Sequence, residues 1–325
     1  MPVREFLRLS AHIQMLPVLE SGEETLVGGQ AVMEGVMMRA PHSYCVAVRK
    51  PSGEIVSEQQ PLARVSEKYP IFGLPVLRGL GTLGQAMWLG LRALRFSATA
   101  AIDTGSADQP AAKIPSWVMA ANLIFSLLFF LFLYKFVPLL LATEVGRHVK
   151  ALDSRFAINM VDGLIRMAIF LTFLSLMARM KDIRRVFEYH GAEHKVVFNY
   201  ESGQAVTVEN AQKFVTWHPR CGTSFLLVVM VLSMLVYALL PFDGFVPKLV
   251  GRIALLPVIA GLSYELIRFA AKRRGGLMSA LTTPGLWLQR ITTKAPSDDQ
   301  TAIAIHALEG AMTLEATQGG ELVIA

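Results

Sequence analysis

Two short stretches of the sequence carry side chains that could together bind a metal ion. The first contains His190 and His194, and the second contains His218 and Cys221. On a helix, side chains four residues apart project from one face about 6 Å apart, so His190 and His194 could hold one ion between them. His218 and Cys221 add an imidazole and a thiolate, and zinc accepts both ligand types in a tetrahedral shell. The spacing predicts a divalent metal site, with zinc as the expected metal.

Glu193, which directly precedes His194, suggests what such a site could do. Two histidines with an adjacent glutamate are the reversed form of the zinc-protease signature. An open coordination position would carry a water whose pKa falls to about 7 on zinc, and Glu193 could accept its proton. The reaction would be hydrolysis of an amide, an ester or a phosphoester. If His190, His194, His218 and Cys221 all bind together, the shell is closed and the zinc is structural. The sequence leaves both arrangements open.

Composition indicates a membrane protein. Of the 325 residues, 53% are hydrophobic and 17% are charged, whereas soluble domains carry about 25% charged residues. The mean hydropathy is +0.45. Cys45 and Cys221 are the two cysteines and lie far apart, which fits a reducing compartment rather than a disulfide framework. Basic residues flank the apolar segments without interleaved aromatic residues, so the lipid bilayer is the expected partner and nucleic acid is not.

Four apolar segments are candidates to cross a hydrocarbon core of roughly 30 Å. They are residues 114–134, 157–178, 225–240 and 253–267. The fourth is the shortest and contains Pro257, so it could be re-entrant instead. Lysine and arginine are concentrated before the first segment, between the second and third, and after the fourth. The positive-inside rule then places both termini and the His-rich loop in the cytoplasm.

We therefore predict a predominantly α-helical integral membrane protein with about four transmembrane helices, a small cytoplasmic β element and cytoplasmic helical segments. Strands are expected at 44–50 and 55–59 around a turn at 51–53, with a further strand or two before Pro70. The glycine-rich residues 27–39 are expected to form a tight loop. The expected organisation is an N-terminal cytoplasmic segment (1–73), an interfacial amphipathic helix and linker (74–110), two spans (111–178), a cytoplasmic His/Cys-rich loop (179–223), two further spans (224–268) and a cytoplasmic helical tail that forms a soluble appendage (269–325).

Ionisable residues near or inside the expected spans are further candidates. Glu265 lies at the cytoplasmic end of the fourth segment, where an unpaired carboxylate would be costly. It could be a further metal ligand, a partner of Arg220 or Arg268, or an acceptor for a ligating histidine. Asp162 and Arg166, four residues apart inside the second segment, are expected to neutralise each other.

Five phrases together resemble one known family. They are GGQAVMEGVMMR (28–39), YHGAEHK (189–195), HPRCGTSF (218–225), SYE (263–265) and PGLWLQ (284–289). This set is similar to the YqhQ-like family of bacterial membrane proteins, a domain of unknown function that is often labelled a predicted metal-dependent enzyme. The resemblance implies a multi-pass protein of the bacterial plasma membrane and a metal site, but no particular reaction. It also makes residues 28–39 a candidate to dock onto the metal site, with Glu34 or Arg39 contacting a ligand or the substrate.

The leading hypothesis is a metal-dependent hydrolase that acts at the cytoplasmic membrane surface. The competing hypothesis is a non-enzymatic membrane scaffold or assembly factor with a structural zinc site. A transporter is a weaker third hypothesis, because four spans with few polar residues offer a poor path unless the chain forms a homo-oligomer. The sequence specifies neither the substrate nor the number of copies that assemble.

Overall fold

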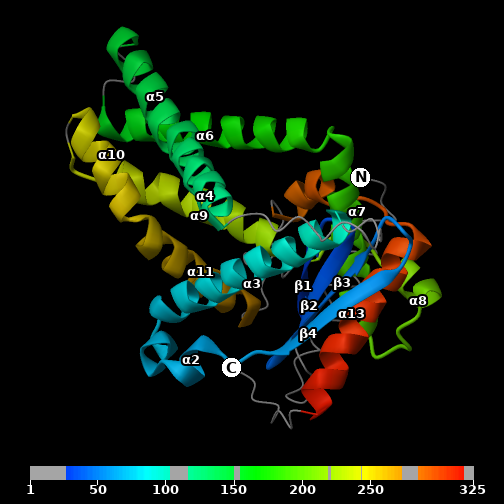
Figure 1. The fold of residues 1–325 in the computed structure, drawn as a ribbon. Helices are drawn as coiled ribbons and strands as arrows, with labels where there is room; N and C mark the ends of the chain where they lie inside the picture. The colour runs from blue at the N-terminus through cyan, green and yellow to red at the C-terminus, as the bar shows by residue number, and fades with distance from the viewer. Residues whose placement is uncertain are drawn as a thin grey trace.

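The computed structural model describes residues 27–102, 116–149, 154–218, 221–242, 244–272 and 285–317. They form two parts, one built on a small β-sheet and one built from long apolar helices (Figure 1). Residues 1–26 of the expected N-terminal segment, residues 103–110 of the expected helix and linker, and Arg220 lie outside the described residues.

The sheet is an antiparallel meander with its strands in chain order. The strands are β1 (Gly28–Val32), β2 (Gly35–Arg39), β3 (Ser43–Arg49) and β4 (Ile55–Pro61). The strands predicted at 44–50 and 55–59 are confirmed as β3 and β4. The prediction of a loop at 27–39 is wrong, because these residues form the β1–β2 hairpin, in which Glu34 adopts a φ of 54° at the turn. Glycine is disfavoured in strands, but here close packing outweighs that preference.

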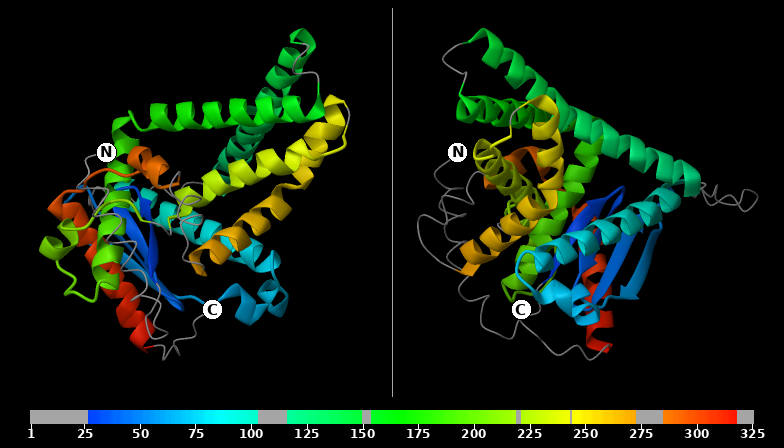
Figure 2. Two further views of the ribbon diagram at one scale, coloured as in Figure 1. Left: turned by 180° about the vertical axis from the view of Figure 1, so that it is seen from behind. Right: turned by 90° about the vertical axis from the view of Figure 1, so that its left-hand side faces the viewer.

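Helices cover both faces of the sheet, as the views in Figures 1 and 2 show. Helix α3 (Leu77–Ile102) packs on one face, while α7 (Lys181–Glu201) and α13 (Asp298–Thr317) pack on the other. Neighbouring residues of one strand point to opposite faces, so Met37 belongs to the core with α3 and Met38 to the core with α7 and α13. Both faces are therefore apolar, and the sheet is an interior layer.

The expectation of a soluble appendage at the C-terminus is wrong for α13. Its residues Ile303, Ala307 and Leu308 are buried in one hydrophobic core with the sheet and α7. A carbon atom added at Gly310 would lie 2.6 Å from the Cys45 sulfur, so the helix approaches β3 closely. The further strands expected before Pro70 are β1 and β2, which precede β3. The residues after β4 form α2 (Val65–Lys68) and the 3-10 helix η2 (Pro70–Gly73).

The apolar part contains the candidate membrane spans. It is made of α4 (Ser116–Leu131), the π-helical turn η3 (Phe132–Phe136), α5 (Val137–His148), α6 (Arg155–Met177), α9 (Gly222–Ala238), α10 (Phe245–Ala254) and α11 (Leu256–Lys272). The first expected span ends too early at residue 134. The helix continues through η3 into α5, and its apolar stretch covers Ala120–His148.

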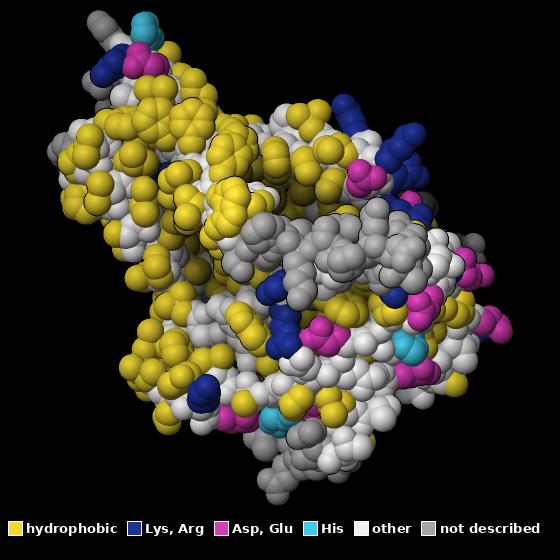
Figure 3. All heavy atoms as spheres, viewed as in Figure 1, with side chains coloured by type: hydrophobic (Ala, Val, Ile, Leu, Met, Phe, Trp, Pro, Cys, Tyr) yellow, Lys and Arg dark blue, Asp and Glu magenta, His cyan; other side chains and the backbone are white. Residues whose placement is uncertain are grey.

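By length and composition, two described helices could each cross a membrane, namely Ala120–His148 and Phe156–Met177. A third candidate is the pair α10 and α11, which is bent by 48° at a short break. Helix α9 is apolar but shorter than the other candidates. In Figure 3, hydrophobic side chains dominate the surface of this part, whereas charged side chains gather on the part with the sheet and at the free end of α5. This surface supports membrane association of the apolar helices.

Candidate metal centre

Helix α7 carries the first two candidate ligands. Its first turn contains Asp182, whose negative charge suits the positive end of the helix dipole. Tyr189, Ala192 and Val196 recur at helical spacing and pack into the core beneath the sheet. This packing fixes the rotation of the helix about its axis.

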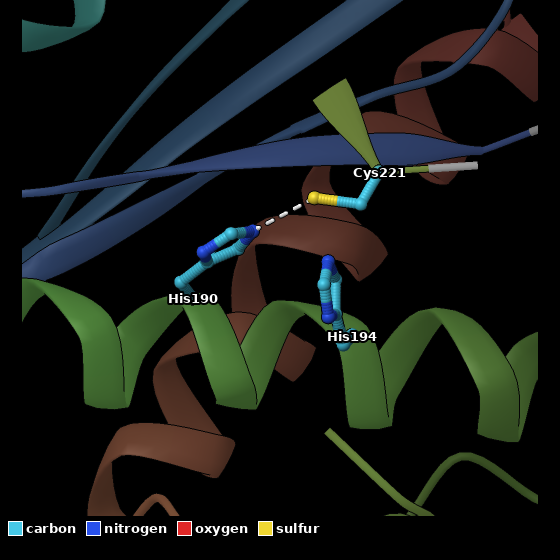
Figure 4. Close-up of side chains that lie close together, drawn as sticks. All are labelled: His190, His194 and Cys221. Atoms are coloured by element: carbon cyan, nitrogen blue, oxygen red, sulfur yellow. Dashed lines mark hydrogen bonds between the residues drawn. The ribbon is translucent and has the colours of Figure 1, made fainter. Parts of the chain in front are cut away.

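The other face of α7 presents His190 and His194 toward Cys221, as Figure 4 shows. The candidate ligand atoms of these three residues all lie within 4.8 Å of one another. The Cys221 thiol donates to Nε2 of His190 at 3.3 Å. Two donors about 2.0–2.3 Å from a tetrahedral zinc ion are separated by roughly 3.3–3.6 Å, so the closest pair already has nearly the spacing that zinc requires.

Backbone carbonyl groups orient both imidazoles. His190 donates from Nδ1 to the carbonyl oxygen of Thr292 at 2.8 Å, and His194 donates from Nδ1 to that of Thr216. With Nδ1 protonated in this way, Nε2 of each ring keeps its lone pair for a metal ion. Ligating histidines usually donate their second nitrogen to such an acceptor. The donor set and its surroundings therefore fit a divalent metal such as zinc.

Gly191 allows the backbone at Lys294, two residues after Thr292, to approach the helix closely. A side-chain carbon at position 191 would lie 2.0 Å from the carbonyl oxygen of Lys294. The same segment is held to α7 by the Lys294 amide, which donates to the Phe187 carbonyl at 2.9 Å. The glycine between the two histidines thus admits the chain that orients His190.

Cys221 stands at the amino end of α9. It is the N-cap residue of this helix, and its sulfur accepts from the Thr223 amide at 3.5 Å. The helix dipole favours negative charge at this position, which suits a metal-bound thiolate. His190 and Cys221 are each partly exposed, whereas His194 is buried, so the group opens toward the surface on the side of His190 and Cys221.

His218 lies beside this group, but the structure does not bring it in as a fourth ligand. Its ring centre is 5.7 Å from that of His194, and its Nε2 faces a carboxylate oxygen of Glu201 at 3.3 Å. The side-chain amide of Gln289 makes two hydrogen bonds to the backbone of His218. The His218 N–H donates to Oε1 of Gln289 at 2.7 Å, and Nε2 of Gln289 donates to the His218 carbonyl at 2.8 Å. His218 is therefore held where its imidazole contacts Glu201.

Glu193 also lies beside the group rather than within it. Its carboxylate Oε2 is 3.4 Å from Nε2 of His194, and its side chain is 6% exposed. A carbon atom added at Gly29 would lie 2.6 Å from Cγ of Glu193, so β1 passes directly over this carboxylate. The expectation that residues 28–39 dock near the metal site thus has a specific contact, made by the backbone of Gly29.

Burial controls the protonation of the inner histidines. Burial, together with the neighbouring His190, lowers the pKa of His194 to about 4. Burial lowers the pKa of His218 to about 4 as well, although the charge of Glu193 opposes this shift. Both imidazoles are therefore neutral at neutral pH, which is the form that binds metals.

The other candidates from the sequence lie farther from the three ligands. Glu34 accepts hydrogen bonds from Arg185 at 2.7 Å and from the Tyr189 hydroxyl at 3.3 Å, and so ties the β1–β2 turn to α7 just before His190. Arg39 donates to Gln85 on α3 at 3.1 Å.

Glu265 pairs with Arg78, and the positive charge of Arg268, one of the two expected partners, also acts on it. Nε of Arg78 donates to it at 2.7 Å, and the Val76 amide donates at 3.1 Å. This arrangement holds α3 against α11.

Sequence reasoning missed the groups that orient the site, namely the carbonyls of Thr216 and Thr292 and the side chains of Glu201 and Gln289. Of these four residues, only Gln289 could have been found from the sequence, because it lies in PGLWLQ (284–289), one of the phrases that carry the family resemblance.

Comparisons with known proteins agree with the resemblance noted in the sequence. Residues 74–314 match a family described as "Protein of unknown function (DUF1385)". The chain is also similar to "Uncharacterized protein YqhQ" of Bacillus subtilis (strain 168), with 36% identity over 299 residues that cover 89% of this chain and 93% of that protein. No solved structure is significantly similar. The extent of both matches shows that the chain belongs to the YqhQ-like DUF1385 family.

Proposed function

We propose that the protein is a metal-dependent hydrolase of the bacterial plasma membrane, with its metal centre at the cytoplasmic face. One observation carries the proposal. His190 and His194 each use Nδ1 to bond a backbone carbonyl, and each leaves Nε2 near the Cys221 sulfur. Histidines that serve only as packed core residues need no such convergence on a thiol.

In this proposal His190, His194 and Cys221 hold one divalent ion, with zinc expected from the mixture of nitrogen and sulfur donors. The bound ion would supply Lewis-acid activation of a water molecule at the open position. Glu193, with its carboxylate 3.4 Å from Nε2 of His194, accepts the proton of the attacking water and passes it to the leaving group. The substrate is an amide, an ester or a phosphoester, and it enters from the side of His190 and Cys221.

A structural zinc site in a membrane scaffold is the second candidate, and His218 is the residue that favours it. Its ring lies next to that of His194, so rotation away from Glu201 would supply a fourth ligand and close the shell. The pairing of His218 with Glu201 and the hold of Gln289 on its backbone favour the open arrangement.

Metal content tests the first step of the proposal. The full chain is purified in detergent without chelator and measured by elemental mass spectrometry as the wild type and as a His190→Ala, His194→Ala double variant. We expect about one zinc or other transition-metal ion per folded chain, lost in the double variant. A His148→Ala, His306→Ala variant, which removes two exposed histidines from other helices, serves as the control. Absence of metal from folded wild type after incubation with zinc overturns the proposal.

Glu193→Gln separates the enzyme from the scaffold. The substitution keeps the size of the side chain, so we expect metal content to be unchanged under both hypotheses. In a hydrolase, loss of the base lowers the rate by about 10²–10⁴-fold, measured with p-nitrophenyl esters and phosphodiesters. The control is Glu209→Gln, which changes an exposed carboxylate on helix α8 (Val208–Gln212). Equal rates in both variants would leave the scaffold as the better explanation.

A further inference from the structure

The apolar part contains a second group of ionisable residues, which includes Tyr237 at the opposite end of α9 from Cys221. Lys135, Arg166 and Arg252 surround the ring of Tyr237, with their charged groups 4.9, 5.1 and 5.4 Å from its centre. Asp162 binds both guanidinium groups, at 2.8 Å to Arg252 and in a closer pair with Arg166. We call these five residues the Tyr237 cluster.

The Tyr237 cluster lies inside the candidate spans rather than at their ends. Lys135 is near the middle of the stretch Ala120–His148, and Arg166 is near the middle of Phe156–Met177. Arg252 precedes the break between α10 and α11. Ionisable residues at this depth usually mark a functional site, because the hydrocarbon core makes charge costly.

The charges within the cluster do not balance. Among the described residues, Asp162 is the one carboxylate that forms ion pairs with these cations, and it pairs with Arg166 and Arg252. A lysine can lose its proton, but a guanidinium group in a protein stays charged. Even with Lys135 neutral, Arg166 and Arg252 therefore exceed Asp162 by one positive charge. A buried cation without a counter-ion is strongly disfavoured, so the described part of the chain leaves the cluster one anion short.

Two donors in the cluster have bonding capacity for that anion. Among the described residues, Nε of Arg166 is buried and has no hydrogen-bond partner. Nζ of Lys135 donates to the Tyr237 hydroxyl at 3.0 Å, and an ammonium group has three N–H donors. By contrast, both terminal nitrogens of Arg252 are in use, by Asp162 and Asn159.

The backbone around the cluster is irregular in the way that membrane binding sites often are. Lys135 lies in the π-helical turn η3, and such turns inside α-helices are frequent at functional sites. Arg252 lies next to the 48° bend of the broken helix pair. Secondary transporters build substrate sites from interrupted helices near the middle of the bilayer.

We propose that the Tyr237 cluster is an oxyanion-binding site, in which Lys135 and Arg166 hold a carboxylate or phosphate group through their vacant donors. Guanidinium groups favour these oxyanions through charge-assisted hydrogen bonds. The site lies in the interior of the spans, whereas the phosphates of lipids lie at the bilayer surface. The ligand is therefore a small water-soluble anion. The proposal rests on membrane insertion of the helices and is independent of the metal centre.

Thermal unfolding of the full chain in detergent tests the site. The melting temperature is followed while a bulky sulfonate salt is replaced, at constant ionic strength, by acetate in one series and by inorganic phosphate in another. We expect a saturable rise in at least one series. A response to acetate alone assigns a carboxylate, and a response to phosphate alone assigns a phosphate. No saturable response in either series overturns the proposal.

Lys135→Met locates the binding. We expect the half-saturating anion concentration to rise at least about tenfold, while the melting temperature without the anion stays level or rises because a buried cation is removed. Arg147→Gln removes a cation from the exposed end of α5 and should respond like the wild type. Equal anion responses in both variants contradict the assignment. If Lys135→Met fails to fold, Tyr237→Phe removes the hydroxyl that positions Lys135 and is judged by the same criterion.

Discussion

Gly191 offers a test of how the candidate centre is built, because it lies between the two proposed histidine ligands and has no side chain to take part in chemistry. In Gly191→Ala, the new methyl group would lie 2.0 Å from the carbonyl oxygen of Lys294 and 3.2 Å from Cγ2 of Thr216. Ordinary contact begins at 3.4 Å, so the Lys294 carbonyl must move by roughly 1.4 Å. This movement displaces the neighbouring Thr292 carbonyl that orients His190.

The size of the effect follows from that shift. Alanine gains roughly 1 kcal/mol over glycine inside a helix, whereas crowding of a packed site costs about 1–3 kcal/mol. We therefore expect a net loss of stability of up to about 2 kcal/mol. Loss of a group that orients a ligating histidine lowers metal affinity by about 10–100-fold. Affinity should thus suffer more than folding.

Zinc affinity is measured by competition with a chromophoric chelator, alongside the melting temperature of the metal-free protein. Gly222→Ala is the matched control, because it lies next to Cys221 and an added carbon there meets no atom within 4 Å. A folded Gly191→Ala protein that binds zinc as tightly as Gly222→Ala would refute the argument that the 292–294 segment positions His190.

Two further predictions concern cysteine reactivity and pH. Burial raises the pKa of Cys45 to about 12, so iodoacetamide should modify the partly exposed Cys221 of the folded, metal-free protein while Cys45 reacts only after unfolding. Peptide mass spectrometry measures this, and zinc should protect Cys221; modification of Cys45 first would contradict it. The lowered pKa values of His194 and His218, about 4 in the folded state, imply that the unfolded chain binds more protons below its ordinary histidine pKa of about 6.5. The stability of the metal-free protein should therefore be fully present above pH 6.5 and decline as the pH falls toward 4, which melting curves measure. Constant stability across this range would show that these imidazoles are not held neutral.

The sequence alone determined the features that depend on local spacing and composition. The interval between His190 and His194 follows from helical periodicity, and β3 and β4 follow from β-branched residues around a Pro-Ser-Gly turn. Apolar length indicated the candidate membrane helices, although the first predicted segment stopped at residue 134, where the run without charged residues ends before Lys135. In the structure Lys135 is buried against Tyr237, and the helix continues.

Tertiary structure decided everything that depends on contacts between distant segments. The chain at 292–294 returns to α7 and supplies the acceptor for His190, and no local pattern encodes a backbone carbonyl's position. From the sequence, Gly29 was predicted to lie in a loop. Its structural role is to leave room for Glu193 beneath β1, and this contact forms only when β1 and α7 pack together. The partners of Glu265 and His218 also depend on the fold. Arg78 bonds Glu265, and Glu201 bonds His218, because folding brings these residues together.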